Sequence, residues 1–233
     1  MRMILALPLF VPGVLAAAPL LAQTSDVTPP SASAAQAEPP PAPAQALAAF
    51  SDPATATRVT LRTAAGPIVL AIETQKAPVT AANFLKYVDG KRLDGTVFYR
   101  TVKVQDEPRY GFIQFGTQND PKRTLPPIAH EPTSKTGLSH VDGAISMAMA
   151  QPGTARGDFF IIVGNTPAMD ASAEGPGYAV FGRVVEGMEV VHRIMDMPTS
   201  PTKGEGIMKG QMLEPTVPVT SATRMPAAAG AGK

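Results

Sequence analysis

The stretch that decides the fold reads GAISMAMA at residues 143–150, a short loop through Pro152 and Gly153, and DFFIIV at residues 158–163. Each apolar run has the length of a strand and is bounded by glycine or proline, so we expect two neighbouring buried strands. Because side chains alternate across a strand, Phe159 and Phe160 must point to opposite faces of the second one. One of these rings therefore has to cover another surface.

Strand and helix patterns continue on both sides of this stretch. Residues 59–72 alternate on either side of Gly66-Pro67, as in a tight hairpin, and residues 78–90 and 188–195 have helical spacing. Further short strands are expected at 97–98, 112–115, 145–149, 159–163 and 179–185, with a closing edge strand near Val217. Periodicity alone predicts only a mainly β fold with two helices, and a closed antiparallel barrel covered by these helices fits that pattern.

Several short motifs occur in one order along the chain. They are Ala77-Pro-Val-Thr-Ala-Ala-Asn-Phe84, Phe98-Tyr-Arg100, Pro127-Ile-Ala-His-Glu131, the GAISMAMA and DFFIIV runs, Gly177-Tyr-Ala-Val-Phe-Gly182 and Val184-Val-Glu-Gly-Met188. In this order the motifs resemble those of the cyclophilin family of peptidyl-prolyl isomerases, in its bacterial exported (periplasmic) branch, over residues 58–222. The resemblance implies a closed eight-stranded antiparallel barrel capped by two α-helices, and rotation about X-Pro peptide bonds.

The resemblance also implies roles for particular residues. Arg100 matches the family's catalytic arginine, Phe160 the aromatic floor of the proline pocket, and Gln114 the glutamine that holds the peptide backbone. The remaining expected substrate-binding residues are Phe112, Met149, Ala150, Asp158, Met169 and Tyr178. Each residue also has an ordinary structural alternative: a solvated strand-end arginine, an exposed glutamine, or a core aromatic or methionine.

This sequence departs from the family pattern at several of these places. The segment before Gln114 is about one residue tighter than usual, which leaves open whether Gly111, Tyr110 or Phe112 takes the place of a pocket phenylalanine. Met149 stands where an asparagine usually binds substrate backbone, Ala168 where a large aromatic often lies, and Tyr178 where the best-known members have histidine.

Asp158 is the departure with the clearest physical consequence, since it stands where a glutamine steadies the arginine. If the register holds, its carboxylate lies near the Arg100 guanidinium and pairs with it.

The chemistry implied by the resemblance requires no metal, nucleophile or cofactor, and we expect none. His130, His140 and His192 have no metal-ligand spacing with other ligand residues. Ser146 lacks a Gly-x-Ser-x-Gly context and an evident histidine partner, which argues against a serine hydrolase.

Composition limits the partners and the compartment. The formal net charge is +1, so no nucleic-acid partner is indicated, and the chain has no cysteine. Residues 1–22 have the layout of a secretory signal peptide, most simply cut after Ala22, and Pro8, Pro12, Gly13 and Pro19 interrupt the apolar run. We therefore expect export to the periplasm and no membrane attachment of the mature form. A retained signal anchor is the alternative.

The rest of the chain divides by composition. Residues 23–54 are rich in alanine and proline and predict a disordered linker, residues 55–224 form one isomerase domain, and residues 225–233 a disordered tail. The expected partners are proline-containing unfolded or partly folded proteins. We expect the protein itself to be a monomer. A proline-binding chaperone module with little turnover is the alternative function, and the clients and the residue preferred before proline stay open.

Overall fold

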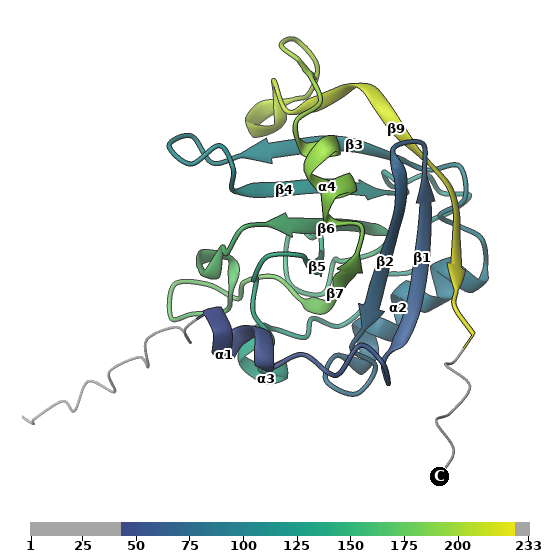
Figure 1. Ribbon diagram of the computed structural model, residues 1–233. Coiled ribbons are helices and arrows are strands. Elements are labelled where there is room, and N and C mark those ends of the chain that lie inside the picture. The colour runs from purple at the N-terminus through teal and green to yellow at the C-terminus, as the bar shows by residue number, and fades with distance from the viewer. Residues whose placement is uncertain (1–42, 227–233) are drawn as a thin grey trace, which may run out of the picture. The chain divides into compact units, whose positions relative to one another are not determined.

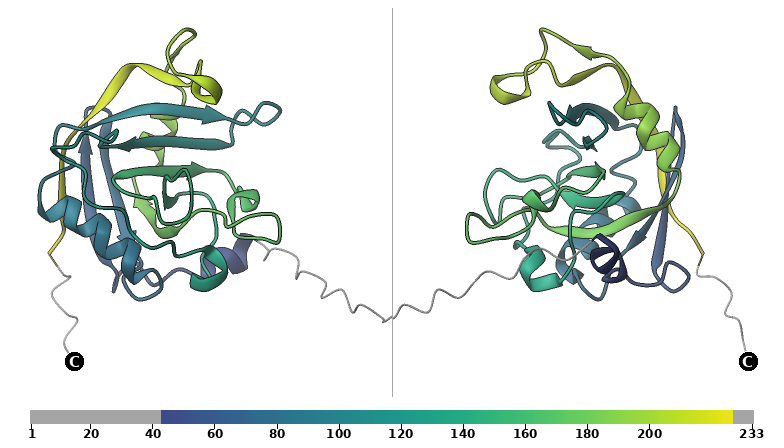
Figure 2. Two further views of the ribbon diagram at one scale, coloured as in Figure 1. Left: turned by 180° about the vertical axis from the view of Figure 1, so that it is seen from behind. Right: turned by 60° about the vertical axis from the view of Figure 1, so that its left-hand side comes forward.

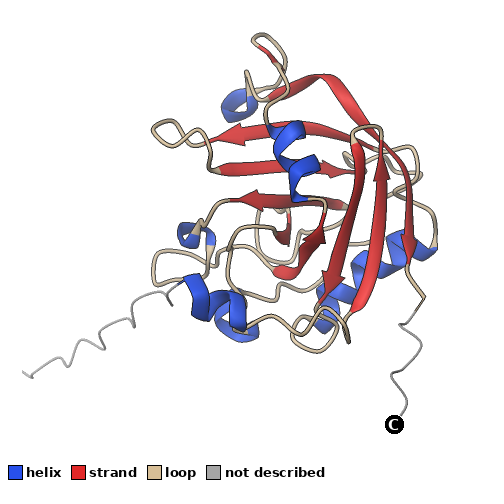
Figure 3. Cartoon of the chain, viewed as in Figure 1, coloured by secondary structure: helices blue, strands red, loops and turns tan. Residues whose placement is uncertain are grey.

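The computed structural model describes residues 43–226. Strands dominate it, with short helices between them (Figure 3). The helices are α1 (Pro43–Ala48), α2 (Pro78–Asp89), α3 (Thr133–Thr136) and α4 (Met188–Met195), with the 3-10 helices η1 (Pro167–Met169) and η2 (Gly206–Met208). The strands are β1 (Thr57–Thr63), β2 (Gly66–Ile72), β3 (Val97–Lys103), β4 (Gly111–Gly116), β5 (Ala144–Met147), β6 (Asp158–Val163), β7 (Val180–Glu186), β8 (Thr199–Ser200) and β9 (Met212–Arg224).

Eight of these strands close into an antiparallel barrel (Figure 1). The order is β1-β2-β7-β5-β6-β4-β3-β9, and β9 pairs with β1 to complete the ring. Among the described strands, the two-residue β8 pairs with β9 alone, outside the ring. The predicted eight-stranded barrel is therefore confirmed. The prediction of an edge strand near Val217 is wrong, because the 13-residue β9 hydrogen-bonds to both β3 and β1.

The first hairpin forms where the sequence predicted it, with a shifted turn. Thr63 pairs with Gly66, so Ala64 and Ala65 make the turn and Pro67 already belongs to β2. Gly66 has a φ of +130°, a conformation that side chains with a Cβ rarely adopt, and this explains why glycine follows the turn directly.

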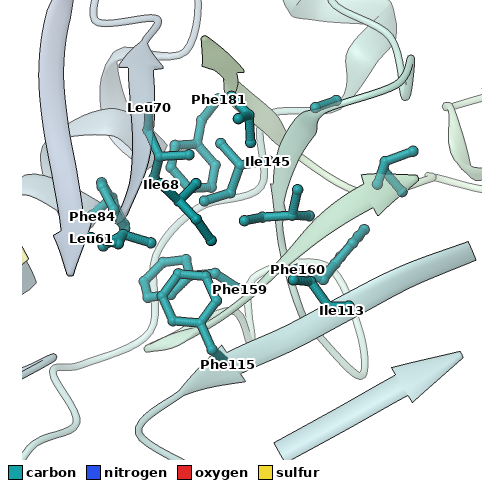
Figure 4. Packing of buried hydrophobic residues seen from close by; sticks show 14 of the residues in the cluster. Leu61, Ile68, Leu70, Phe84, Ile113, Phe115, Ile145, Phe159, Phe160 and Phe181 are labelled. Atoms are coloured by element: carbon teal, nitrogen blue, oxygen red, sulfur yellow. The ribbon is translucent and has the colours of Figure 1, made fainter. Parts of the chain in front are cut away.

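The core fills the barrel beneath α2, and Figure 4 shows its packing. Phe84 of α2 lies 5.0 Å from the ring of Phe159 in an edge-on arrangement, and Phe115 and Phe181 also pack against Phe159. Phe159 is fully buried. Phe160, the next residue on β6, packs instead with Phe112 and Tyr178. The opposite orientations expected for the two rings are confirmed.

The segment before β1 is more ordered than the sequence predicted. Residues 43–54 were assigned to a disordered linker, yet α1 forms there, Ala46 and Phe50 are buried, and the Ser51 hydroxyl donates to Glu73 at 2.7 Å. The physical reason is Phe50, whose ring meets the Arg183 guanidinium at 5.8 Å and joins the core. Residues 23–42 lie outside the described part of the chain.

We expect Phe50→Ala to lower the free energy of unfolding by about 2–3 kcal/mol. This is below the roughly 3–5 kcal/mol typical of a central phenylalanine, because the neighbouring short helix collapses more easily into the cavity. Leu47→Ala, at a residue that is 44% exposed, is the matched control and should cost much less. Urea unfolding measures both, and equal losses would contradict the packing of this segment.

No helix within residues 43–226 is long and apolar enough to cross a membrane. The signal peptide expected at residues 1–22 lies outside the described residues, as do residues 227–233 of the expected tail.

Candidate functional site

A cavity of about 810 Å³ opens beside β3, β4 and β6. Its size is in the range of ordinary ligand pockets. All nine residues that the sequence singled out line it: Arg100, Phe112, Gln114, Met149, Ala150, Asp158, Phe160, Met169 and Tyr178. They come from three strands, from η1 and from the loops after β5 and before β7, so the fold brings together residues up to 78 positions apart.

Arg100 is held at this cavity by two carboxamides. Its Nε and Nη2 donate to Gln211 Oε1 at 2.9 and 2.6 Å, and its Nη1 donates to Gln114 Oε1 at 3.0 Å. A guanidinium has five N–H groups, so two remain without a partner among the described residues. Burial lowers the pKa of Arg100, but an arginine in a protein keeps its charge near neutral pH. The site therefore contains an oriented cation with unused donors.

Gln114 lies directly across from Arg100 in the pairing of β3 with β4, and it is buried. Because arginine only donates, the Gln114 atom that faces Arg100 must be the oxygen. The NH₂ group of Gln114, which lies near the Tyr99 hydroxyl, is then the end that can donate to a carbonyl.

Aromatic rings form the apolar part of the cavity. The Phe160 ring lies 5.2 Å from Phe112 and 5.4 Å from Tyr178, the latter at 88°. The Arg100 guanidinium carbon lies 5.3 Å from the centroid of Phe112, within cation–π range. The charged donor is thus placed beside an apolar aromatic surface.

The register of β4 decides which residue supplies the second ring. Gly111 is buried against β3, and a Cβ there would lie 1.9 Å from the Val102 carbonyl oxygen. Tyr110 is 41% exposed and its ring lies against Gly164, away from the cavity lining. Phe112 is therefore the ring that enters the cavity.

The expected pairing of Asp158 with Arg100 is wrong. Asp158 Oδ1 accepts from the Tyr99 hydroxyl at 3.1 Å and from the Gln118 N–H at 2.9 Å, and it forms no ion pair with Arg100. The reason is the register, since Asp158 pairs with Gly116, two residues beyond the Gln114 and Phe160 pair. Asp158 still lines the cavity.

We expect the charge of Asp158 to cost stability at neutral pH. Burial raises the pKa of this carboxyl above its usual 3.8, and the bonds from Gln118 and Tyr99 lower it less. The folded protein therefore binds this proton more tightly than the unfolded chain. As the pH rises above 3.8, the contribution of Asp158 to the free energy of unfolding falls, and it levels off once the pH exceeds the pKa of Asp158 in the folded protein. Asp158→Asn keeps an acceptor oxygen and should be more stable than wild type at pH 7.

Urea unfolding at pH 4 and pH 7 tests this, with Asp106→Asn, at an exposed loop residue, as the control. The gain should be smaller at pH 4. A variant that is equally destabilised at both pH values would contradict the account and make the carboxylate a structural requirement.

A buried chain of hydrogen bonds supports Phe160 from behind. His140 Nδ1 lies 2.5 Å from Asp170 Oδ1, and His140 Nε2 lies 3.0 Å from Ser146 Oγ. The expectation that Ser146 has no histidine partner is therefore wrong. His140 and Ser146 are fully buried, so this chain offers no substrate access, and the His140 ring stacks parallel to Phe160 at 6.1 Å. These hydrogen bonds hold the His140 ring in place behind Phe160.

The segment between β8 and β9 also contributes to the site, although no sequence motif predicts it. Gln211 binds Arg100, and Ile207, Met208 and Met212 line the cavity. No motif marks them, since this segment is a glycine- and lysine-rich stretch with no periodic pattern. Within residues 43–226, no group of three or more His, Asp or Glu side chains lies together as a metal site.

Comparisons with known proteins agree with this geometry. Residues 58–223 match the family described as cyclophilin type peptidyl-prolyl cis-trans isomerase/CLD. The chain is 39% identical over 150 residues to peptidyl-prolyl cis-trans isomerase A of Dickeya dadantii, covering 62% of this chain and 74% of the relative. It is 36% identical over 149 residues to peptidyl-prolyl cis-trans isomerase B of Escherichia coli, covering 60% and 85%.

A crystal structure of a cyclophilin type peptidyl-prolyl cis-trans isomerase from Cryptosporidium parvum superposes with a TM-score of 0.57 at 18% identity. It covers 73% of this chain and 98% of that one, which shows the shared fold.

Proposed function

The chain belongs to the family of cyclophilin-type peptidyl-prolyl cis-trans isomerases, and from this we propose that it rotates X-Pro bonds of extracytoplasmic proteins and so assists their folding. The observation that carries the proposal is the Arg100 guanidinium, held by Gln114 and Gln211 beside the rings of Phe112 and Phe160.

Rotation about an X-Pro bond is slow because amide resonance must be broken, at a barrier of about 18–20 kcal/mol. In the twisted transition state the prolyl nitrogen loses conjugation and becomes a better hydrogen-bond acceptor. A cationic donor that meets this nitrogen only when the bond twists lowers the barrier without tightening ground-state binding equally. A stabilisation of about 7 kcal/mol gives roughly a 100,000-fold acceleration.

The cavity supplies the parts that this mechanism needs. The surface of Phe160, Phe112 and Met169 receives the pyrrolidine ring, and the NH₂ group of Gln114 donates to a substrate carbonyl. An unused N–H of Arg100 then donates to the twisted nitrogen. The Met149 side chain has no hydrogen-bond donor where the family has an asparagine, so the peptide backbone depends more strongly on Gln114.

Catalysis of a proline-limited refolding reaction tests the proposal. The slow refolding phase of a model protein with a non-native prolyl isomer is followed with and without catalytic amounts of the full chain. We expect the phase to accelerate in proportion to enzyme concentration. Retardation that requires stoichiometric amounts, with no acceleration, would contradict the proposal and favour the chaperone alternative.

Export is the second part of the proposal. It rests on the layout of residues 1–22 and on the bacterial relatives. In a bacterial host, we expect mass spectrometry of the periplasmic fraction to find a protein that begins at Gln23. A full-length chain in the membrane fraction would indicate a retained anchor, and one in the cytoplasm would contradict export.

A further inference from the structure

We propose that Gln211 is the positioning residue that holds the Arg100 guanidinium in its working orientation, an inference that rests on the proposed function. Gln211 precedes β9 and lies 111 positions from Arg100 in the sequence. Its Oε1 receives two of the three hydrogen bonds that the guanidinium makes to described residues.

The placement of Gln211 is fixed by the backbone around it. Thr101, next to Arg100, donates its N–H to the Gln211 carbonyl at 3.0 Å, and Met212 pairs with both Arg100 and Ser200. Gly210 N–H donates to Lys203 O at 3.0 Å, which closes the base of the segment. In both views of Figure 2 this yellow-green segment stands above β3. The Gln211 carboxamide therefore extends from a segment whose backbone is held by hydrogen bonds on both sides.

The chemistry of the contact matters as much as its position. Nε and Nη2 share one acceptor, which fixes the plane of the guanidinium at the end of a long flexible side chain. Because a carboxamide is neutral, it orients the cation without neutralising it, so the remaining N–H groups keep their donor strength. Asp158, at the position where the family places its steadying glutamine, bonds to Tyr99 and Gln118 and is occupied elsewhere.

Gln211→Leu tests the assignment, since leucine has similar volume and no acceptor. We expect kcat on a proline tetrapeptide to fall about 10- to 100-fold, because a misplaced donor still binds but no longer meets the twisted nitrogen. The KM and the melting temperature should change little. Gln75→Leu, at an exposed residue outside the cavity, is the matched control and should behave as wild type.

Gln211→Glu keeps an acceptor and provides a rescue. It should hold the guanidinium again, with kcat between the leucine variant and wild type, because a carboxylate also withdraws donor strength.

The Arg100 Nε–H signal in NMR spectra, identified by its absence in Arg100→Lys, reads the positioning directly. We expect a resolved, slowly exchanging signal in wild type that is lost in Gln211→Leu and regained in Gln211→Glu. A folded Gln211→Leu that keeps both kcat and this signal would overturn the proposal. A wild-type protein without turnover would instead refute the proposed function, while the signal still decides whether Gln211 positions Arg100.

A separate observation points to substrate preference. Ile207, which is 87% exposed, and Met208, which is 38% exposed, adjoin each other on η2 and line the cavity together with Met212. Two neighbouring exposed apolar side chains at the mouth of a binding cavity extend its apolar surface. We infer that they bind an apolar client side chain next to the proline.

Peptides with leucine or glutamate on either side of proline test this inference. Wild type should prefer a leucine peptide by about 3- to 10-fold in kcat/KM, and Ile207→Ser with Met208→Ser should bring the ratio near one. Val79→Ser, at an exposed residue of α2, is the control and should keep the preference. A double variant with an unchanged ratio would overturn the inference. A wild-type protein that isomerises none of the peptides would refute the proposed function instead.

Discussion

Arg100→Ala is expected to reduce kcat/KM on a proline tetrapeptide by at least about 100-fold. The loss removes a charged donor that acts on the twisted prolyl nitrogen, and removal of one such donor from an enzyme site typically costs about 100- to 1,000-fold. The Arg100 side chain is half-buried and hydrogen-bonds only to Gln114 and Gln211 among the described residues, so the barrel should stay folded without it. Isomerisation is measured without a coupling protease, and folding by circular dichroism.

Arg62→Ala provides the matched control for this variant. Arg62 is an exposed arginine on β1 and does not line the cavity, so its removal should leave turnover unchanged. Arg100→Lys should be slow as well, because a single ammonium does not reproduce the planar contacts to both carboxamides. A folded Arg100→Ala protein with near-normal turnover would remove Arg100 from the mechanism.

Phe160→Ala is expected to weaken both peptide binding and folding. Phe160 is only 2% exposed, packed from behind by His140 and in front by Phe112 and Tyr178. Truncation of a buried phenylalanine costs about 3–5 kcal/mol, so the variant should unfold at a much lower urea concentration. Loss of the pocket floor should reduce peptide affinity by at least about tenfold.

Leucine substitutions at the two neighbouring phenylalanines separate the two effects. Phe160→Leu keeps most of the volume, so we expect a stability loss below about 2 kcal/mol but a clear loss of peptide affinity. Phe159→Leu should reduce stability and leave affinity unchanged, because its ring packs against Phe84 in the core. Peptide titration by NMR measures the affinities. The reverse pattern would show that Phe159 faces the ligand.

The local elements of this fold were predictable because their signals are local. The runs around Ile145 and Ile161, the helix after Pro78 and the hairpin at Gly66 all carry alternation or turn residues within a few positions. A closed barrel was expected, but the two partners of β9 were not visible, since its pairing with β1 joins residues about 160 positions apart and periodicity does not report partners. Phe50 was missed because one buried ring is enough to order a segment of otherwise disorder-prone composition.

The residues of the candidate site likewise fall into those that sequence motifs predicted and those that only the structure reveals. Arg100, Gln114 and Phe160 were identified from motifs that resemble a known family, and the register of β3, β4 and β6 places them side by side. Gln211 belongs to no motif, so only the structure relates it to Arg100. The Asp158 prediction failed because a resemblance gives the position of a residue but not which donors compete for it, here the Tyr99 hydroxyl and the Gln118 amide.

A substrate peptide bond should rotate faster while it occupies this cavity. Exchange NMR on a proline tetrapeptide saturated with the full chain measures the cis–trans rate within the complex itself. We expect a rate at least about 1,000-fold above that of the free peptide. In Arg100→Ala this acceleration should be lost, although the peptide still shifts the signals of Phe112 and Gln114. A bound peptide that shifts these signals but exchanges no faster than the free peptide would contradict this expectation, and would make the protein a binding module.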